Sequence, residues 1–168
     1  MLFIALAVSS VAAIAADYPA RPVRLIVPFP PGGGVDATAR VLSQKLTEAW
    51  HQQVVPDNRT GAGTTIGNEI AARAAPDGYT LLQVATSHAT NPALGVRMPF
   101  DPVRDFAPIT LLSQSLNLWI VHPSLPVKSV RELIALAQSR PGEINYSSSG
   151  AGSSQHLAGE LLKLSAHI

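Results

Sequence analysis

The chain has 168 residues, no cysteine and a formal net charge of +1. Its hydrophobic content of 46% is ample for a packed core, which argues against a disordered protein. The near-neutral charge, without a lysine or arginine cluster, argues against a nucleic-acid partner, and the lack of cysteine excludes disulfides and cysteine metal sites.

An apolar, alanine-rich run opens the chain. Residues 2–15 are too few to span a bilayer comfortably, and they end in Ala-Ile-Ala shortly before Asp17. This pattern is typical of a secretory signal peptide, so we predict that residues 1–16 are removed on export and that the protein is periplasmic. No positive charge precedes the run, which leaves open a weak signal or a true start upstream; a buried N-terminal helix is the alternative.

The most informative stretch follows at residues 23–36. Its β-branched apolar start predicts a buried strand over residues 23–28, which prolines and three consecutive glycines then end. Asp36 comes next, and helical spacing predicts a helix from there to Trp50. Free N–H groups and the positive end of the helix dipole meet at such a junction, which favours an anion such as a carboxylate.

A tight turn with Asp36 as the helix N-cap explains the same residues without any ligand. The glycines lack the G-x-G-x-x-G spacing and no Lys-Ser or Lys-Thr follows, so neither a dinucleotide fingerprint nor a phosphate loop is indicated, and we expect no cofactor. Asp36 is negative and should not contact a carboxylate directly. It would cap the helix, or it would receive an ammonium or hydroxyl group of the ligand.

Strands and helices continue to alternate after this helix. Strands are predicted over residues 53–58 and 80–85, with a helix between them from Thr64 or Thr65 to Ala75. Residues 86–108 are rich in proline and turn residues and are expected to be irregular. The β-α-β-α-β order implies a parallel sheet with right-handed crossovers, so the predicted fold class is α/β.

The rest of the chain repeats this pattern. Residues 106–121 suit one or two strands, a helix capped by Ser129 extends to residue 137, and residues 144–147 form a brief strand. A serine- and glycine-rich loop at 148–154 then precedes a helix over 155–163. Ligands of open α/β sheets bind beyond the carboxyl ends of strands, so two such loops would form a cleft, unless they are unrelated turns.

We predict two lobes, with lobe 1 over residues 17–116 and lobe 2 over residues 117–168. Lobe 2 shows a single strand–helix–strand–helix run. A parallel sheet of that size has an open edge and an uncovered face. We therefore expect the second lobe to be incomplete in this chain.

Several longer motifs resemble one known family. They are YP-x-RPVRLIVPFPPGGG-x-D from Tyr18, NR-x-GAG from Asn58, APDGYTLL from Ala75 and NY-x-S-x-G-x-GS from Asn145. These motifs resemble the Bug/TctC solute-binding proteins of tripartite tricarboxylate transporters. The resemblance implies a two-lobed, type II-like periplasmic-binding-protein fold that closes on a small organic acid. It also implies the membrane permease subunits of the transporter as partners, and a monomer.

The same resemblance implies the ligand-binding residues. The family holds a ligand carboxylate between its first strand–helix loop and the corresponding loop of lobe 2, partly through ordered water. Carried over to this chain, the ligand-binding residues are Phe29, Pro30, Gly32, Gly33, Gly34 and Asp36 on one side, Ser148, Gly150, Gly152, Ser153 and Ser154 on the other, and Ser87, His88 and Asn91 at the floor.

The resemblance does not fix the ligand, which could be a di- or tricarboxylate, an acidic amino acid or an aromatic acid. A hydrolase is disfavoured because no G-x-S-x-G is present and Ser87-His88 and His156 lack the spacing of a triad or a metal site. A periplasmic sensor that uses the same cleft, or a non-functional fragment, stays an alternative.

Overall fold

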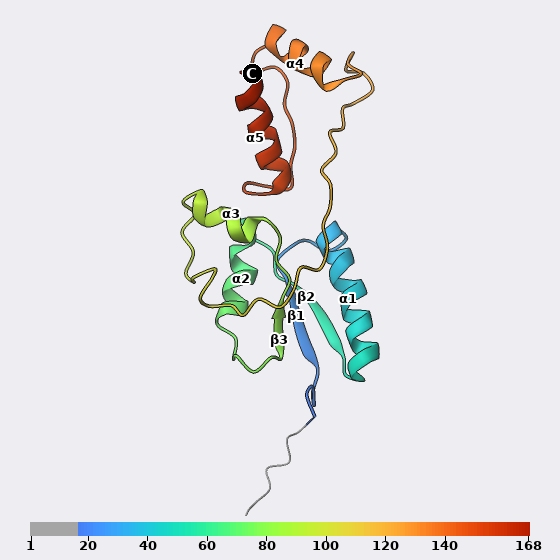
Figure 1. Cartoon of the computed structure of the whole chain (residues 1–168), viewed down its shortest axis with the longest axis vertical. Helices are drawn as coiled ribbons and strands as arrows, with labels where there is room; N and C mark the ends of the chain where they lie inside the picture. Colours follow the sequence, from blue (N-terminus) through green and yellow to red (C-terminus); the bar gives the residue numbers. More distant parts are fainter. Residues whose placement is uncertain (1–16) are drawn as a thin grey trace, which may run out of the picture.

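The structure is a computed structural model that describes residues 17–168 (Figure 1). The predicted signal peptide lies outside the described residues. The elements in chain order are β1 (Val23–Val27), α1 (Gly34–Trp50), β2 (Val54–Asn58), the 3₁₀ turn η1 (Ala62–Thr64), α2 (Thr65–Ala72), β3 (Thr80–Leu82), α3 (Ser87–Ala93), α4 (Val130–Ser139) and α5 (Ser154–Ala166).

The three strands form a parallel sheet in the order β2-β1-β3, which confirms the predicted α/β class. In the register, Leu25 of β1 lies between Pro56 of β2 and Leu81 of β3. The central strand is buried almost throughout, since helices cover both of its faces (Figure 1). A strand covered on both faces reads as a continuous apolar run, which is why Leu25-Ile26-Val27 could be predicted as a strand.

The core lies between the sheet and α1. Val23, Leu25 and Val27 alternate along β1 and pack with Ala39 of α1 and Val54 of β2. The side chain of Ile26 points to the opposite face, on which α2 packs against β1 and β3. The order strand, helix, strand, helix, strand therefore places one helix on each face of the sheet.

The expectation of irregular structure over residues 86–108 is wrong for its first part, because Ser87–Ala93 form α3. Pro92 is one of the prolines of this region, and it lies in the last turn of this short helix. Its missing N–H removes a single intrahelical bond there. The helix still closes, since the Leu94 N–H donates to the Thr90 carbonyl oxygen at 3.0 Å.

The strands expected over residues 106–121 and 144–147 do not form in the described residues. A strand exists through its ladder of bonds to a neighbour, and within residues 17–168 neither segment has a neighbouring strand. Residues 106–121 instead run as an extended segment with strongly exposed apolar side chains, including Leu116 (93% exposed) and Ile120 (87%).

We call residues 17–108 the sheet region and residues 109–168 the C-terminal region. The C-terminal region holds α4 and α5, which lie beyond one end of the sheet and are reached through the extended segment (Figure 1). A hydrogen bond from Gln138 Nε2 to the Ala166 carbonyl oxygen (3.0 Å) joins these two helices. None of the helices in residues 17–168 combines the length and the apolar character needed to cross a bilayer.

Candidate functional site

The carboxyl ends of the three parallel strands meet at one edge of the sheet, and a helix begins after each of them. The loop after β1 leads into α1, the loop after β2 leads into η1 and α2, and the loop after β3 leads into α3. The first N–H groups of a helix have no intrahelical partner and carry the positive end of its dipole. This edge therefore gathers donors suited to an anion.

The glycine loop, residues 28–33, presents such donors without any basic side chain. Gly32 has φ +83°, a left-handed conformation that glycine adopts at little cost and that turns the chain into α1. Within residues 17–168, the N–H groups of Gly34 and Val35 donate to no protein acceptor. They are two of the free donors at the start of α1, where the Ala37 N–H is the first to find an acceptor, the Gly33 carbonyl oxygen at 2.9 Å.

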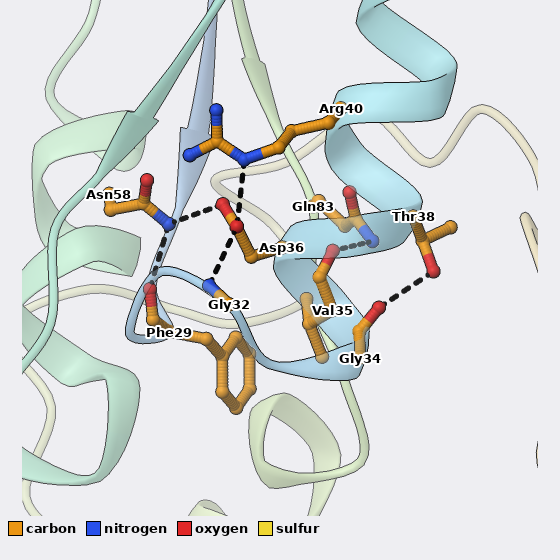
Figure 2. A network of polar contacts seen from close by, with 9 residues as sticks. All are labelled: Phe29, Gly32, Gly34, Val35, Asp36, Thr38, Arg40, Asn58 and Gln83. Atoms are coloured by element: carbon orange, nitrogen blue, oxygen red, sulfur yellow. Dashed lines mark hydrogen bonds and ion pairs between the residues drawn. The ribbon is translucent and has the colours of Figure 1, made fainter.

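Behind the loop, the buried Asp36 carboxylate is the centre of a polar network (Figure 2). Its Oδ2 atom accepts hydrogen bonds from Arg40 Nε at 2.8 Å and from the Gly32 N–H at 2.9 Å. Its Oδ1 atom accepts a bond from Asn58 Nδ2 at 2.9 Å. The Arg40 guanidinium, the Gly32 N–H and the Asn58 amide together hold the pKa of Asp36 well below its usual range.

Two amide side chains at the ends of β2 and β3 complete this network, and neither is among the predicted site residues. Asn58 Nδ2 also donates to the Phe29 carbonyl oxygen at 3.0 Å, and Gln83 Nε2 donates to the Val35 carbonyl oxygen at 3.2 Å (Figure 2). Asn58 and Gln83 could have been predicted from their positions in the sequence, because polar residues at the carboxyl ends of parallel strands converge at one edge of the sheet.

The loop after β2 has an unusual backbone. Ala62 and Thr64 have φ of +46° and +81°, and a left-handed conformation is rare for a β-branched residue such as threonine. Buried side chains of α3 contact this loop: Asn91 Nδ2 donates to the Gly63 carbonyl oxygen at 2.8 Å, and Ser87 Oγ lies 3.2 Å from Thr64 Oγ1. Backbone strain of this kind persists where the surroundings fix it, and it clusters at functional sites.

His88, predicted at the floor of the site, has its ring engaged within the protein. Its Nδ1 atom lies 3.2 Å from Asn68 Nδ2, and its Nε2 atom lies 2.9 Å from the Pro102 carbonyl oxygen. The ring also stacks on Phe100 and meets Phe106 edge-on. Both ring nitrogens therefore already have hydrogen-bond partners without any ligand.

The serine- and glycine-rich loop over residues 148–154 contacts the sheet region at α3. Thr90 Oγ1 donates to the Gly152 carbonyl oxygen at 2.6 Å, and a Cβ atom at Gly152 would lie 2.7 Å from Asn91 Oδ1. Ser153 caps α5 by accepting from the His156 N–H at 3.2 Å. Ser154 Oγ donates to Asn117 Oδ1 at 3.3 Å.

The structure thus groups the predicted site residues into two clusters. Phe29, Gly32 and Asp36 share the network behind the glycine loop, whereas Ser87 and Asn91 lie with the strained loop after β2. Gly152 joins the second cluster through Thr90. Among the described residues, Ser148 has no hydrogen bond to either cluster: its Oγ accepts from the neighbouring Gly150 N–H at 3.3 Å.

A hollow of about 600 Å³ lies elsewhere, in the C-terminal region, and includes Trp119, Leu133, Ile144 and Tyr146 in its lining. None of the predicted ligand-binding residues lines it. Among residues 17–168, no three His, Asp or Glu side chains gather closely enough to hold a metal ion.

Residues 38–168 match the model of the tripartite tricarboxylate transporter family receptor, TctC. The chain belongs to this TctC family. BugT of Bordetella pertussis is 39% identical over 165 residues, which cover 97% of this chain and 51% of BugT. A protein encoded between tcbD and tcbE in Pseudomonas sp. strain P51 is 38% identical over 151 residues, or 90% of this chain and 45% of that protein.

Solved structures of TctC-like proteins agree with this assignment. A protein of R. palustris with adipate has a TM-score of 0.87 and 40% identity, over 90% of this chain and 51% of the solved chain. MatC of Rhodopseudomonas palustris with bound malate has a TM-score of 0.76 and 28% identity, over 90% of this chain and 52% of the solved chain. This chain thus spans about half the length of the relatives it matches.

These likenesses confirm the predicted family and the periplasmic-binding-protein fold, of which this chain represents about half. At the level of the TctC family, the relatives are periplasmic solute-binding proteins rather than enzymes. The boundary between the two lobes at residues 116 and 117 and the assignment of individual ligand-binding residues stay predictions.

Proposed function

We propose that this chain is part of an extracytoplasmic solute-binding protein that captures a small organic acid, a dicarboxylate or tricarboxylate, for a tripartite tricarboxylate transporter. The observation that carries the proposal is the pair of free N–H groups of Gly34 and Val35 at the start of α1. Two similar proteins hold adipate and malate, and both ligands are dicarboxylates.

Backbone donors suit this task. A carboxylate forms charge-assisted hydrogen bonds, which are about twice as strong as neutral ones, so it can be held without an arginine or lysine. The glycine loop contains neither residue, and the nearby Arg40 already pairs with Asp36. The protein would act without chemistry on its ligand, in the periplasm and as a monomer, and would deliver the acid to membrane permease subunits.

A pair of substitutions at Gly34 tests the role of the backbone donor. Gly34 is the first residue of α1, where proline is well tolerated, and the preceding Gly33 is extended (φ −79°, ψ 170°), as a residue before proline should be. Gly34→Pro therefore deletes the N–H group and keeps the helix. Gly34→Ala keeps the N–H group, and its Cβ atom would meet nothing within 4 Å.

The measurement is calorimetric titration of the 168-residue chain and both variants with adipate, malate and citrate, and with adipamide as an uncharged control. Gly34→Ala should bind like the wild type, whereas Gly34→Pro should bind about tenfold or more weakly because a hydrogen bond to a charged group is lost. Equal affinity for adipate and adipamide, no binding by the wild type, or equal affinities of the two variants would contradict the proposal.

A further inference from the structure

We propose that Asp36 is a positioning residue that, together with Asn58 and Arg40, fixes the glycine loop so that the Gly34 and Val35 N–H groups stay free for a ligand. This inference rests on the proposed function, and it assigns Asp36 to the support of the site and not to ligand contact.

The burial and the partners of the Asp36 carboxylate argue against the ligand-contact alternative. The residue is 2% exposed, and it has three donors within the protein, from the loop, from α1 and from the end of β2 (Figure 2). A buried charge is costly unless it is paired and hydrogen-bonded, and this one meets that condition without a ligand. At this degree of burial the carboxylate is not open to an ammonium or hydroxyl group of a ligand.

The network holds the loop at two points. The Gly32 N–H is drawn inward to Asp36 Oδ2, and the Phe29 carbonyl oxygen is bonded to Asn58 Nδ2, which also donates to Asp36 Oδ1. The intervening Pro30 and Pro31 have no N–H group and a restricted φ. A loop held in this way is ordered before a ligand arrives, so binding does not pay for ordering it.

The same network explains how a negative residue can lie beside a site for an anion. The Arg40 guanidinium forms an ion pair with Asp36 at 2.8 Å, which offsets its charge. Asp36 stays ionised at neutral pH, since Arg40 first, and then Gly32 and Asn58, hold its pKa well below its usual range. The carboxylate thereby keeps three acceptor bonds and adds little repulsion toward a bound acid.

Asp57 provides a matched control. It is the neighbour of Asn58 on β2, and it also accepts from two arginines, Arg24 Nε at 2.7 Å and Arg59 Nε at 2.9 Å. Within the described residues, none of its side-chain bonds reaches the glycine loop. Asp57→Asn therefore removes a charge from an arginine-bonded aspartate close by and leaves the loop network intact.

The experiment compares Asp36→Asn and Asp57→Asn in the 168-residue chain by NMR relaxation of the backbone amides and by titration with adipate. In Asp36→Asn, an NH₂ group replaces one of the two acceptor oxygens. An NH₂ group cannot accept a hydrogen bond, so at least one of the three bonds is lost. Order parameters at Gly32–Val35 should fall from about 0.85 to below about 0.6, values of rigid and flexible backbone. The Kd for adipate should rise about tenfold, the scale of one lost charged hydrogen bond. Asp57→Asn should change neither quantity.

An ordered loop in Asp36→Asn would overturn the positioning role, and so would a disordered loop with unchanged Kd. If Asp36→Asn does not fold, Arg40→Ala answers the question, since it removes one donor at a side chain that is 57% exposed. Arg40→Ala should lower the order parameters at Gly32–Val35 by less than Asp36→Asn would. Unchanged order parameters there would count against the proposal. A wild type that binds none of adipate, malate and citrate would refute the proposed function, while the order parameters would still decide whether Asp36 fixes the loop.

Discussion

In the sheet region, α1 and α2 pack on opposite faces of a parallel sheet, whereas within residues 17–168 no sheet lies beneath α4 and α5 of the C-terminal region. All the buried hydrophobic side chains of the described residues belong to the first region, between Val23 and Val54. In the second region, the residues that reach full burial are Gly152 and Gly159.

The helices of the two regions also begin differently. In the sheet region, α1, α2 and α3 start without a side-chain cap, while α4 and α5 are each capped by a serine. Tertiary packing supplies most helical stability in proteins, so a packed helix can do without a cap, and its first N–H groups stay available. The uncapped start of α1 is therefore tolerated because the core holds that helix in place.

The largest expected effect is in the core of the sheet region. Leu25→Ala should lower the free energy of unfolding by about 2–5 kcal/mol, because the side chain is 2% exposed and its loss leaves a cavity. Leu116→Ala, at a side chain that is 93% exposed, should change it by less than about 0.5 kcal/mol. Urea unfolding of both variants measures this, and similar losses would show that the C-terminal region shares one core with the sheet.

A pair of helical glycines sharpens the comparison. A Cβ atom at Gly67 of α2 would lie 2.7 Å from the Arg59 carbonyl oxygen and 2.7 Å from Pro28 Cβ, which the backbone holds in place. Gly67→Ala should therefore cost about 1–3 kcal/mol by overpacking.

At Gly159 of α5, the added Cβ atom would meet the tip of the Tyr146 ring at 2.6 Å. Tyr146 is 42% exposed and can swing away, so the gain of about 1 kcal/mol in helix propensity should offset much of the cost. Thermal unfolding of both variants tests the difference. A larger loss for Gly159→Ala would mean that the C-terminal region packs as tightly as the sheet region.

The contact between the two regions can be tested at Gly152. Gly152→Ala and Gly142→Ala share the backbone cost of a left-handed residue, since φ is +77° and +75°, but nothing lies within 4 Å of a Cβ at Gly142. At Gly152 the Cβ would crowd Asn91 and Thr90, for a further cost of about 1 kcal/mol. Hydrogen exchange should rise in α3 and in residues 148–156 for Gly152→Ala alone; equal exchange in both variants would count against this contact.

Local signals explain what could be predicted from the sequence. The β-branched run of β1, the prolines and the glycines specify the strand, the loop and the start of α1 within about a dozen residues. Local signals could not decide whether residues 106–121 form strands, because the hydrogen-bond ladder of a strand depends on a partner strand that is remote in sequence. The same limit left the role of Asp36 open, since its donor Asn58 lies 22 residues further along the chain.

The smallest effect expected is at the cap of α4. Ser129 Oγ accepts from the Glu132 N–H at 3.2 Å, and Glu132 Oε2 accepts in return from the Lys128 N–H at 2.7 Å. Because α4 has ten residues, none of them buried, local bonds matter more to it than packing does. Ser129→Ala should destabilise the helix by about 1 kcal/mol and lower the helical signal in circular dichroism.

The matched control for this change is Ser139→Ala, at the other end of the same helix, where the hydroxyl donates to the Leu136 carbonyl oxygen and caps no N–H group. Ser139→Ala should leave the helical signal nearly unchanged, because alanine is the better helix former and no orphan donor loses its partner. If both serine variants lost the same signal, the cap would not be what holds α4. If neither lost any, α4 would be held by packing, and the contrast between the two regions would have to be given up.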